Sequence, residues 1–234
     1  MELSKRLAAV AGLVSAGRTA ADIGTDHGYI PIYLVESGIC PKAFAMDVRK
    51  GPLERAREHI TGHGLGNYIE TRLSDGLSAL TPGEADCMIA AGMGGNLIIR
   101  ILEEGREALS QMEECILQPQ SEITKVRAYL ETNGYVSVRE DMVYEDGKYY
   151  PMMKMQKASG AVKAYTEMEY RYGRLLLEQK HPVLKEFLER EVAGKEKILR
   201  DLAGRPGSRI REREEELRAE LLLAQEAYAQ VTEE

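Results

Sequence analysis

Short apolar runs alternate with amphipathic segments along the first half of the chain. Five of the runs have the length and composition of buried strands, and most are separated by apolar residues at helical spacing. The expected strands are 19–23, 42–47, 69–73, 85–91 and 114–118, and the expected helices are 3–16, 29–36, 52–60, 97–102 and 122–132. This alternation predicts an α/β domain with a parallel sheet covered by helices on both faces.

Two further runs, 135–144 and 148–156, are rich in residues that favour strands and are joined by Glu145-Asp146-Gly147. They predict an antiparallel hairpin. A parallel sheet that ends in a hairpin is typical of Rossmann-like class I methyltransferases rather than of dehydrogenases. We therefore expect residues 1–160 to form one such domain with a mainly parallel, seven-stranded sheet.

From residue 161 onward the chain is rich in Glu, Arg, Leu and Ala, with breaks at His181-Pro182 and at residues 204–208. Pro182 is expected to start or kink a helix, because proline disfavours helical geometry in the residue before it. In the last segment Ile210, Leu217, Ala224 and Val231 lie seven residues apart, which is the repeat of a coiled coil. Residues 161–234 are therefore predicted to form a helical, antiparallel coiled-coil domain.

The 234-residue chain has a formal net charge of −7, which argues against a protein that coats nucleic acid through its overall charge but leaves room for a local basic face. It contains no apolar run long enough for a membrane span, and no secretory signal is recognised, so we expect a cytoplasmic protein. Its three cysteines are widely spaced, which makes a disulfide framework or metal site unexpected. Cys87 and Cys115 are expected in buried strands, and Cys40 near a loop.

Candidate functional residues follow the expected parallel strands. The first strand leads into a turn that contains Asp22, Gly24 and Gly28, and its glycines allow a close approach to a ligand. Asp47 ends the second strand, where a Rossmann site places a carboxylate for ribose hydroxyls. The remaining candidates follow the third and fourth strands: Asp75, Gly76, Gly92 and Met93. All should meet at one edge of the sheet.

Asp26 distinguishes between two cofactor classes. A dinucleotide site needs glycines around a pyrophosphate at a helix N-terminus, where a carboxylate would repel the phosphates. S-adenosylmethionine has no phosphate, and its sulfonium and ammonium groups would be attracted by Asp26. The first turn therefore favours S-adenosylmethionine over a nicotinamide dinucleotide.

The segments 21–31, 45–47, 74–77, 91–95 and 117–120, together with the expected terminal coiled coil, resemble the bacterial TrmK family. The resemblance extends over essentially the whole chain, and Asp-His-Gly-Tyr with Ala-Gly-Met-Gly-Gly is its most specific part. It implies methylation of N1 of adenine 22 in tRNA, with S-adenosylmethionine as the methyl donor. Under this hypothesis Asp26, His27 and Tyr29 border the pocket for cofactor and base, while Gly92 and Met93 form its floor.

Basic residues supply candidate tRNA contacts in two places. Arg205 and Arg209 lie at the expected tip of the helical hairpin, and Lys5 and Arg6 lie near the expected pocket. The alternative for the tail is a coiled coil that packs on itself or dimerises, and we expect a monomer or a weak homodimer. Two other functions stay open: methylation of another acceptor, and a non-catalytic adaptor that keeps a degenerate pocket.

Overall fold

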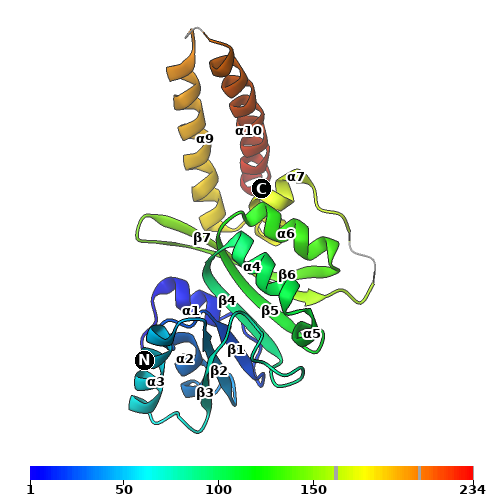
Figure 1. Cartoon of the computed structure of the whole chain (residues 1–234). Helices are drawn as coiled ribbons and strands as arrows, with labels where there is room; N and C mark the ends of the chain where they lie inside the picture. The colour runs from blue at the N-terminus through cyan, green and yellow to red at the C-terminus, as the bar shows by residue number, and fades with distance from the viewer. Residues whose placement is uncertain (161–162, 205–206, 234) are drawn as a thin grey trace. The chain divides into compact units, whose positions relative to one another are not determined.

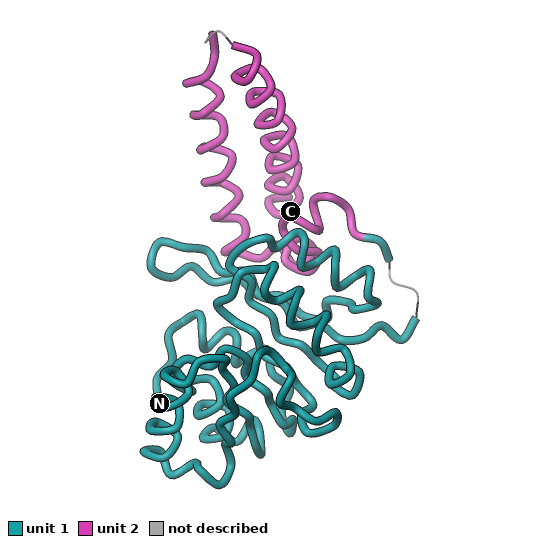
Figure 2. The backbone as a smooth tube through the Cα atoms, in the orientation of Figure 1, with its two compact units in different colours: residues 1–164 teal, residues 165–234 magenta. Residues whose placement is uncertain are grey.

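The protein, seen here as a computed structural model, is described at residues 1–160, 163–204 and 207–233. It divides into two compact units, residues 1–164 and 165–234 (Figures 1 and 2). The first unit contains the sheet, and the described part of the second consists of helices and short connections.

A seven-stranded sheet forms the centre of the first unit, in the order β3-β2-β1-β4-β5-β7-β6 (Figure 1). Its neighbours pair in parallel from β3 to β5, whereas β7 is antiparallel to both β5 and β6. The strands are β1 (Ala20–Ile23), β2 (Ala43–Asp47), β3 (Ile69–Leu73), β4 (Cys87–Gly94), β5 (Glu114–Ser121), β6 (Tyr135–Glu145) and β7 (Lys148–Lys157). The prediction of a mainly parallel sheet closed by a hairpin is confirmed.

Helices cover both faces of this sheet. One face packs against α1 (Lys5–Ala11), α2 (Tyr29–Glu36) and α3 (Lys50–Gly62), and the other against α4 (Gly95–Glu104), α5 (Arg106–Leu109) and α6 (Ile123–Thr132). Each helix contributes apolar side chains to one of two cores, such as Ile32 and Ile60 on the first face and Ile98 and Leu130 on the second. Burial of these side chains removes apolar surface from water and fixes the strand ends relative to one another.

Two elements differ from their expected lengths. The helix expected at 3–16 begins after Ser4, whose hydroxyl accepts a hydrogen bond from Leu7 N, and it ends at Ala11, after which Leu13 and Val14 are buried in tight turns. Strand β4 was expected to end at Ala91, yet it extends to Gly94 because β5 continues beside it as far as Ser121. This extension has register shifts around Gly92, so the strand is irregular where the candidate site begins.

In the second unit, α7 (Glu167–Tyr172) and α8 (Arg174–Glu178) precede the long helices α9 (Pro182–Leu202) and α10 (Ser208–Thr232). Pro182 starts α9, as expected. The helices α9 and α10 run side by side in opposite directions (Figure 1). Leu217, Ala224 and Val231 are buried on α10 while Ile210 is only half-buried, and a regular coiled coil stays a prediction.

No helix in the described ranges has the length and apolar character needed to cross a membrane. Within the same ranges, no three His, Cys, Asp or Glu side chains group in a way that could hold a metal ion. All three cysteines are free and buried: Cys87 and Cys115 lie in β4 and β5, and Cys40 lies in the loop between α2 and β2.

Candidate functional site

The central strands β1 and β4 create the crevice in which parallel sheets bind ligands. From β1 the chain continues to β2 and β3 on one side, and it returns on the other side as β4 and β5. Such a reversal of strand order leaves an opening at the carboxyl ends of the two strands. Two pockets, of about 210 and 360 Å³, lie there, and Gly24 and Ala91 line both of them.

Gly24 brings the first turn against the end of β4. Its backbone has φ +74°, and a Cβ atom at this position would collide with the Cε methyl of Met93. The N–H groups of Gly24 and Thr25 both donate to the carbonyl oxygen of Met46, which fixes the turn on β2. The structure thus brings the candidates Gly24 and Met93 together, and only glycine fits the turn as it stands.

The other candidate glycines serve different purposes. Gly28 caps α2 with φ +69°, and a Cβ there would lie 3.4 Å from the Cβ of Ala56 on α3; this glycine lines neither pocket. Gly76 lines the larger pocket, and its added Cβ would lie 3.2 Å from Ile101. Gly92 also lines the larger pocket and has φ +78°. Gly28 therefore serves the packing of the α2 start against α3.

Asp22 and Asp47 are buried carboxyl groups at the ends of neighbouring strands. Asp22 lines the smaller pocket, and its burial, with repulsion from Asp47, raises its pKa from 3.8 to about 7. Asp47 lines the larger pocket and accepts a hydrogen bond of 2.7 Å from the N–H of Arg49. A cationic or hydroxyl-bearing ligand would therefore meet one of these carboxyl groups in either pocket.

Asp75 lies at the outer wall of the larger pocket and is half exposed. Its two carboxylate oxygens accept hydrogen bonds of 3.2 and 3.0 Å from Arg100 on α4. Arg100 also lines this pocket and is not among the residues predicted from the sequence. The sequence did offer one indication of its role, because Arg100 is the only basic residue of α4.

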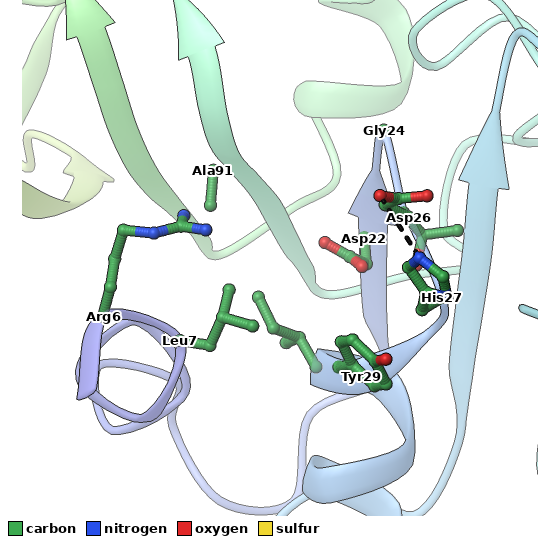
Figure 3. A pocket seen from close by; sticks show the side chains of 10 residues that line it. Arg6, Leu7, Asp22, Gly24, Asp26, His27, Tyr29 and Ala91 are labelled. Atoms are coloured by element: carbon green, nitrogen blue, oxygen red, sulfur yellow. Dashed lines mark ion pairs between the residues drawn. The ribbon is translucent and has the colours of Figure 1, made fainter. Parts of the chain in front are cut away.

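Three aromatic rings stack beside the smaller pocket. The rings of His27 and Tyr29 are 5.1 Å apart and nearly parallel, and the ring of His59 lies 5.3 Å from His27 and 5.6 Å from Tyr29. His27 and Tyr29 line the pocket (Figure 3). His59, on α3, lies outside it and stacks against both rings. Flat aromatic faces of this kind can stack on a planar ligand.

Asp26 is largely exposed at the same rim. Its carboxylate accepts a hydrogen bond of 2.9 Å from Arg55 and lies 3.6 Å from Nε2 of His27 (Figure 3). The hydrogen bond from Arg55 holds the pKa of Asp26 below its ordinary value. Asp26 is therefore a fixed negative charge beside the rings. Arg55 and His59 were not predicted as site residues from the sequence. Their spacing of four residues, on the helix that follows Asp47, places them on one face of that helix and could have indicated a shared role.

The candidate basic residues lie in three different settings. Arg6 on α1 reaches into the smaller pocket from the side opposite Asp26 and His27 (Figure 3). Lys5 lies outside both pockets, and its Nζ donates to the carbonyl oxygen of Tyr144. Arg209 is exposed on α10 in the second unit, and Arg205 lies outside the described residues.

The residues present can hold an organic cofactor in the larger pocket. Gly24, with the Met93 side chain packed against it, adds no side chain of its own to the pocket. Asp47 supplies an acceptor for hydroxyl groups, and Leu97 and Ile101 supply apolar surface. The smaller pocket then offers stacked rings and charges of both signs to a second, planar molecule. Two ligands bound in this way would meet at Gly24 and Ala91.

Comparisons with known proteins point to one enzyme family. The sequence model of the methyltransferase domain matches residues 3–153. The tRNA (adenine(22)-N(1))-methyltransferase of Bacillus subtilis is 39% identical over 153 residues, which are 65% of this chain and 64% of that relative. The alignment thus spans a little less than two thirds of the length of this curated relative.

Solved structures match over nearly the whole chain. The B. subtilis m1A22 tRNA methyltransferase TrmK has 30% sequence identity and a TM-score of 0.84, covering 97% of this chain and 99% of that one. A Streptococcus pneumoniae protein, provisionally assigned as a tRNA (m1A22) methyltransferase and solved with S-adenosyl-L-methionine, has 33% identity and a TM-score of 0.86, with coverage of 97% and 100%. M. capricolum TrmK, solved with S-adenosyl-homocysteine, has 27% identity and a TM-score of 0.84, with coverage of 99% and 100%.

Proposed function

Because this chain belongs to the TrmK family of methyltransferases, we propose that it transfers a methyl group from S-adenosylmethionine to N1 of adenine 22 in tRNA. One observation carries the proposal: two pockets share Gly24 and Ala91 as a common wall at the carboxyl ends of β1 and β4. A methyl donor in one pocket and an acceptor base in the other would face each other at that wall.

We assign the larger pocket to the cofactor, in keeping with the relatives solved with S-adenosyl-L-methionine and S-adenosyl-homocysteine. Bound S-adenosylmethionine supplies an electrophilic methyl group on a sulfonium. In this assignment Asp47 accepts hydrogen bonds from the ribose hydroxyls, and Asp75 and Gly76 border the far end of the pocket. Gly24 allows close approach, and a nearby cation favours the ionised form of Asp22.

We assign the smaller pocket to the target base. The base has to leave its stack to reach the pocket, and Tyr29 and His27 offer it a new stacking surface. N1 of adenine already carries an in-plane lone pair, so alignment contributes more to the rate than a strong base does. As N1 gains the methyl group it gains positive charge, and the carboxylate of Asp26 at the rim stabilises that charge.

The proposal for tRNA contacts covers both units. Arg6 contacts the RNA at the smaller pocket, and Lys5 contacts it beside that pocket. Arg209, on α10, contacts another part of the RNA. We further propose a cytoplasmic protein that is a monomer or a weak homodimer. Arg209→Gln should lower the slope of log affinity against log salt by about one if Arg209 binds a phosphate, and an unchanged slope would remove it from the interface.

A filter assay with methyl-tritiated cofactor tests the proposed reaction. The substrates are two unmodified transcripts of one tRNA, identical except that the second has guanine in place of adenine 22. We expect label in the first transcript only. Equal labelling would indicate another acceptor nucleotide, and no labelling despite cofactor binding would favour the adaptor function.

A further inference from the structure

Arg6 brings a positive charge into the smaller pocket from outside the sheet. It is half-buried on α1, and its guanidinium points toward Ala91 (Figure 3). One of its terminal nitrogens, Nη1, donates a hydrogen bond of 3.1 Å to Oε1 of Gln118. The face of the Tyr150 ring lies 5.5 Å from the guanidinium carbon, which is within the range of a cation–π contact.

In the described part of the chain no ion pair neutralises this guanidinium; the carboxylate of Glu145 accepts from the backbone N–H of Arg6, at 3.4 Å, and not from its side chain. No carboxylate there pairs with the Arg6 guanidinium, and its Nε and Nη2 atoms have no hydrogen-bond acceptor. These two nitrogens are not buried, so they remain available to water or to an anionic ligand in the pocket. The edge formed by Nε and Nη2 can bind two oxygens of one anionic group at once.

Gln118 holds this guanidinium in place from within β5, where it pairs with Ala91 of β4. Its side chain is buried, and Oε1 accepts hydrogen bonds of 3.1 Å from both Arg6 Nη1 and Gly92 N, while its Nε2 donates to the carbonyl oxygen of Pro119. The amide is thus fixed on both of its polar atoms. Since glutamine is uncharged, it orients Arg6 without neutralising it.

We propose that Arg6 binds a backbone phosphate next to the target adenosine, and that Gln118 is the positioning residue that holds Arg6 for this contact. The inference rests on the proposed function and specifies which part of the substrate meets this wall of the pocket. The opposite wall carries His27, Tyr29 and the negative Asp26, which suit a base that becomes cationic. A phosphate matches Arg6 better than the base edge does, because the methylated base would repel a guanidinium.

A chemical double-mutant cycle tests the contact. The enzyme is wild type or Arg6→Gln, and the tRNA carries a neutral methylphosphonate in place of the phosphate either 5′ or 3′ of adenosine 22. We expect Arg6→Gln to lower kcat/KM about tenfold or more, mainly through KM, with cofactor affinity and thermal unfolding unchanged. One of the two methylphosphonates should lower the wild-type value by a similar factor and leave Arg6→Gln unaffected.

If each methylphosphonate changes kcat/KM by the same factor in the wild type and in Arg6→Gln, Arg6 does not bind either phosphate. If the wild type fails to methylate even the unmodified tRNA that has all its phosphates, the proposed function itself is wrong, so the two failures are distinguishable. Arg57→Gln is the matched control, since Arg57 bonds to Thr71 and lines neither pocket.

Gln118→Glu separates positioning from a merely structural role. Glutamate keeps both acceptor bonds of Oε1 but adds a negative charge that pairs with Arg6 and competes with phosphate. We expect Gln118→Glu to raise KM for tRNA about as much as Arg6→Gln does, while cofactor affinity is retained. An unchanged KM in Gln118→Glu, in a variant with wild-type thermal unfolding, would contradict the assignment of Gln118.

Discussion

Nδ1 of His59 lies 3.0 Å from the backbone carbonyl oxygen of His27, and the two imidazole rings stack 5.3 Å apart. The backbone of His27 has φ +61°, a conformation that non-glycine residues rarely adopt. A contact from α3 therefore stabilises a strained turn that also carries Asp26 and Tyr29. His59 is outside both pockets, yet it determines where the pocket rings lie.

Replacement of His59 should affect methyl transfer more than cofactor binding. Loss of both the hydrogen bond and the stack in His59→Ala allows the rings to shift, and we expect kcat/KM to fall on the order of tenfold to a hundredfold. His59→Phe keeps the stack and should retain more activity. His63→Ala, which removes an imidazole from beyond the end of the same helix, is the control. Loss of cofactor affinity in His59→Phe would contradict this role.

Asp22 should make stability depend on pH in a defined direction. Its pKa is about 7 in the folded protein, against 3.8 for the ordinary group, so the folded state retains a proton that the unfolded chain releases. The free energy of unfolding should therefore fall as the pH rises from about 4 to about 7, and stay level above, with a total effect of at most about 4 kcal/mol. Urea unfolding of the ligand-free protein measures it, and Asp22→Asn should lack this slope.

The same carboxyl group should make cofactor affinity rise with pH. Binding of a cationic ligand near Asp22 favours the ionised carboxylate, so calorimetric affinity should increase between pH 6 and pH 8. Asp22→Asn retains every other titrating group and should lose this part of the pH dependence. Identical pH profiles for the wild type and the variant would show that Asp22 does not respond to the cofactor.

Gly24 and Met93 offer a steric test of the turn. Alanine at position 24 must adopt a left-handed backbone, which costs roughly 1–2 kcal/mol, and its Cβ collides with Met93. We expect Gly24→Ala to lower the unfolding temperature and to abolish detectable cofactor binding. In the double variant with Met93→Ala the collision is gone, so part of the stability should return. The methyl group at position 24 still occupies space that the cofactor needs, so cofactor binding should stay weak. Full recovery of cofactor binding in the double variant would contradict the close approach at Gly24.

Asp47 should contribute directly to cofactor affinity. A charge-assisted hydrogen bond contributes about 1.5–3 kcal/mol, so Asp47→Ala should weaken binding of S-adenosyl-homocysteine about tenfold or more. Glu70→Gln removes a carboxylate from the outer strand β3 without touching either pocket and serves as the control. Unchanged affinity in Asp47→Ala, measured by calorimetry, would mean that this carboxylate does not hold the ribose.

The sequence was most informative where a residue's place depends on strand order alone. Asp22, Asp47 and Asp75 lie at or within two residues of the carboxyl ends of β1, β2 and β3, so the alternation of strands and helices was enough to bring them to one edge of the sheet. His59, Arg100 and Gln118 could not be assigned in this way. Their roles depend on which side of a helix or strand faces the crevice, and on partners many residues away in the chain.

The glycines show a related limit. Gly24 and Gly28 look equivalent in the sequence, and both have a positive φ, but one faces the pockets and the other faces Ala56 on α3. Similarly, β4 ends where its neighbour β5 stops pairing with it. The apolar residues of β4 alone do not predict that position. Tertiary partners decide both outcomes.

The chemical identity of the methylated nucleoside tests the central claim most directly. Unmodified tRNA is incubated with the protein and S-adenosylmethionine, digested to nucleosides and analysed by mass spectrometry against authentic standards. The proposed function, which rests on the similarity to tRNA (adenine(22)-N(1))-methyltransferases, predicts 1-methyladenosine at up to one residue per tRNA. N6-methyladenosine, a methylated guanosine or no methylated nucleoside at all would contradict it.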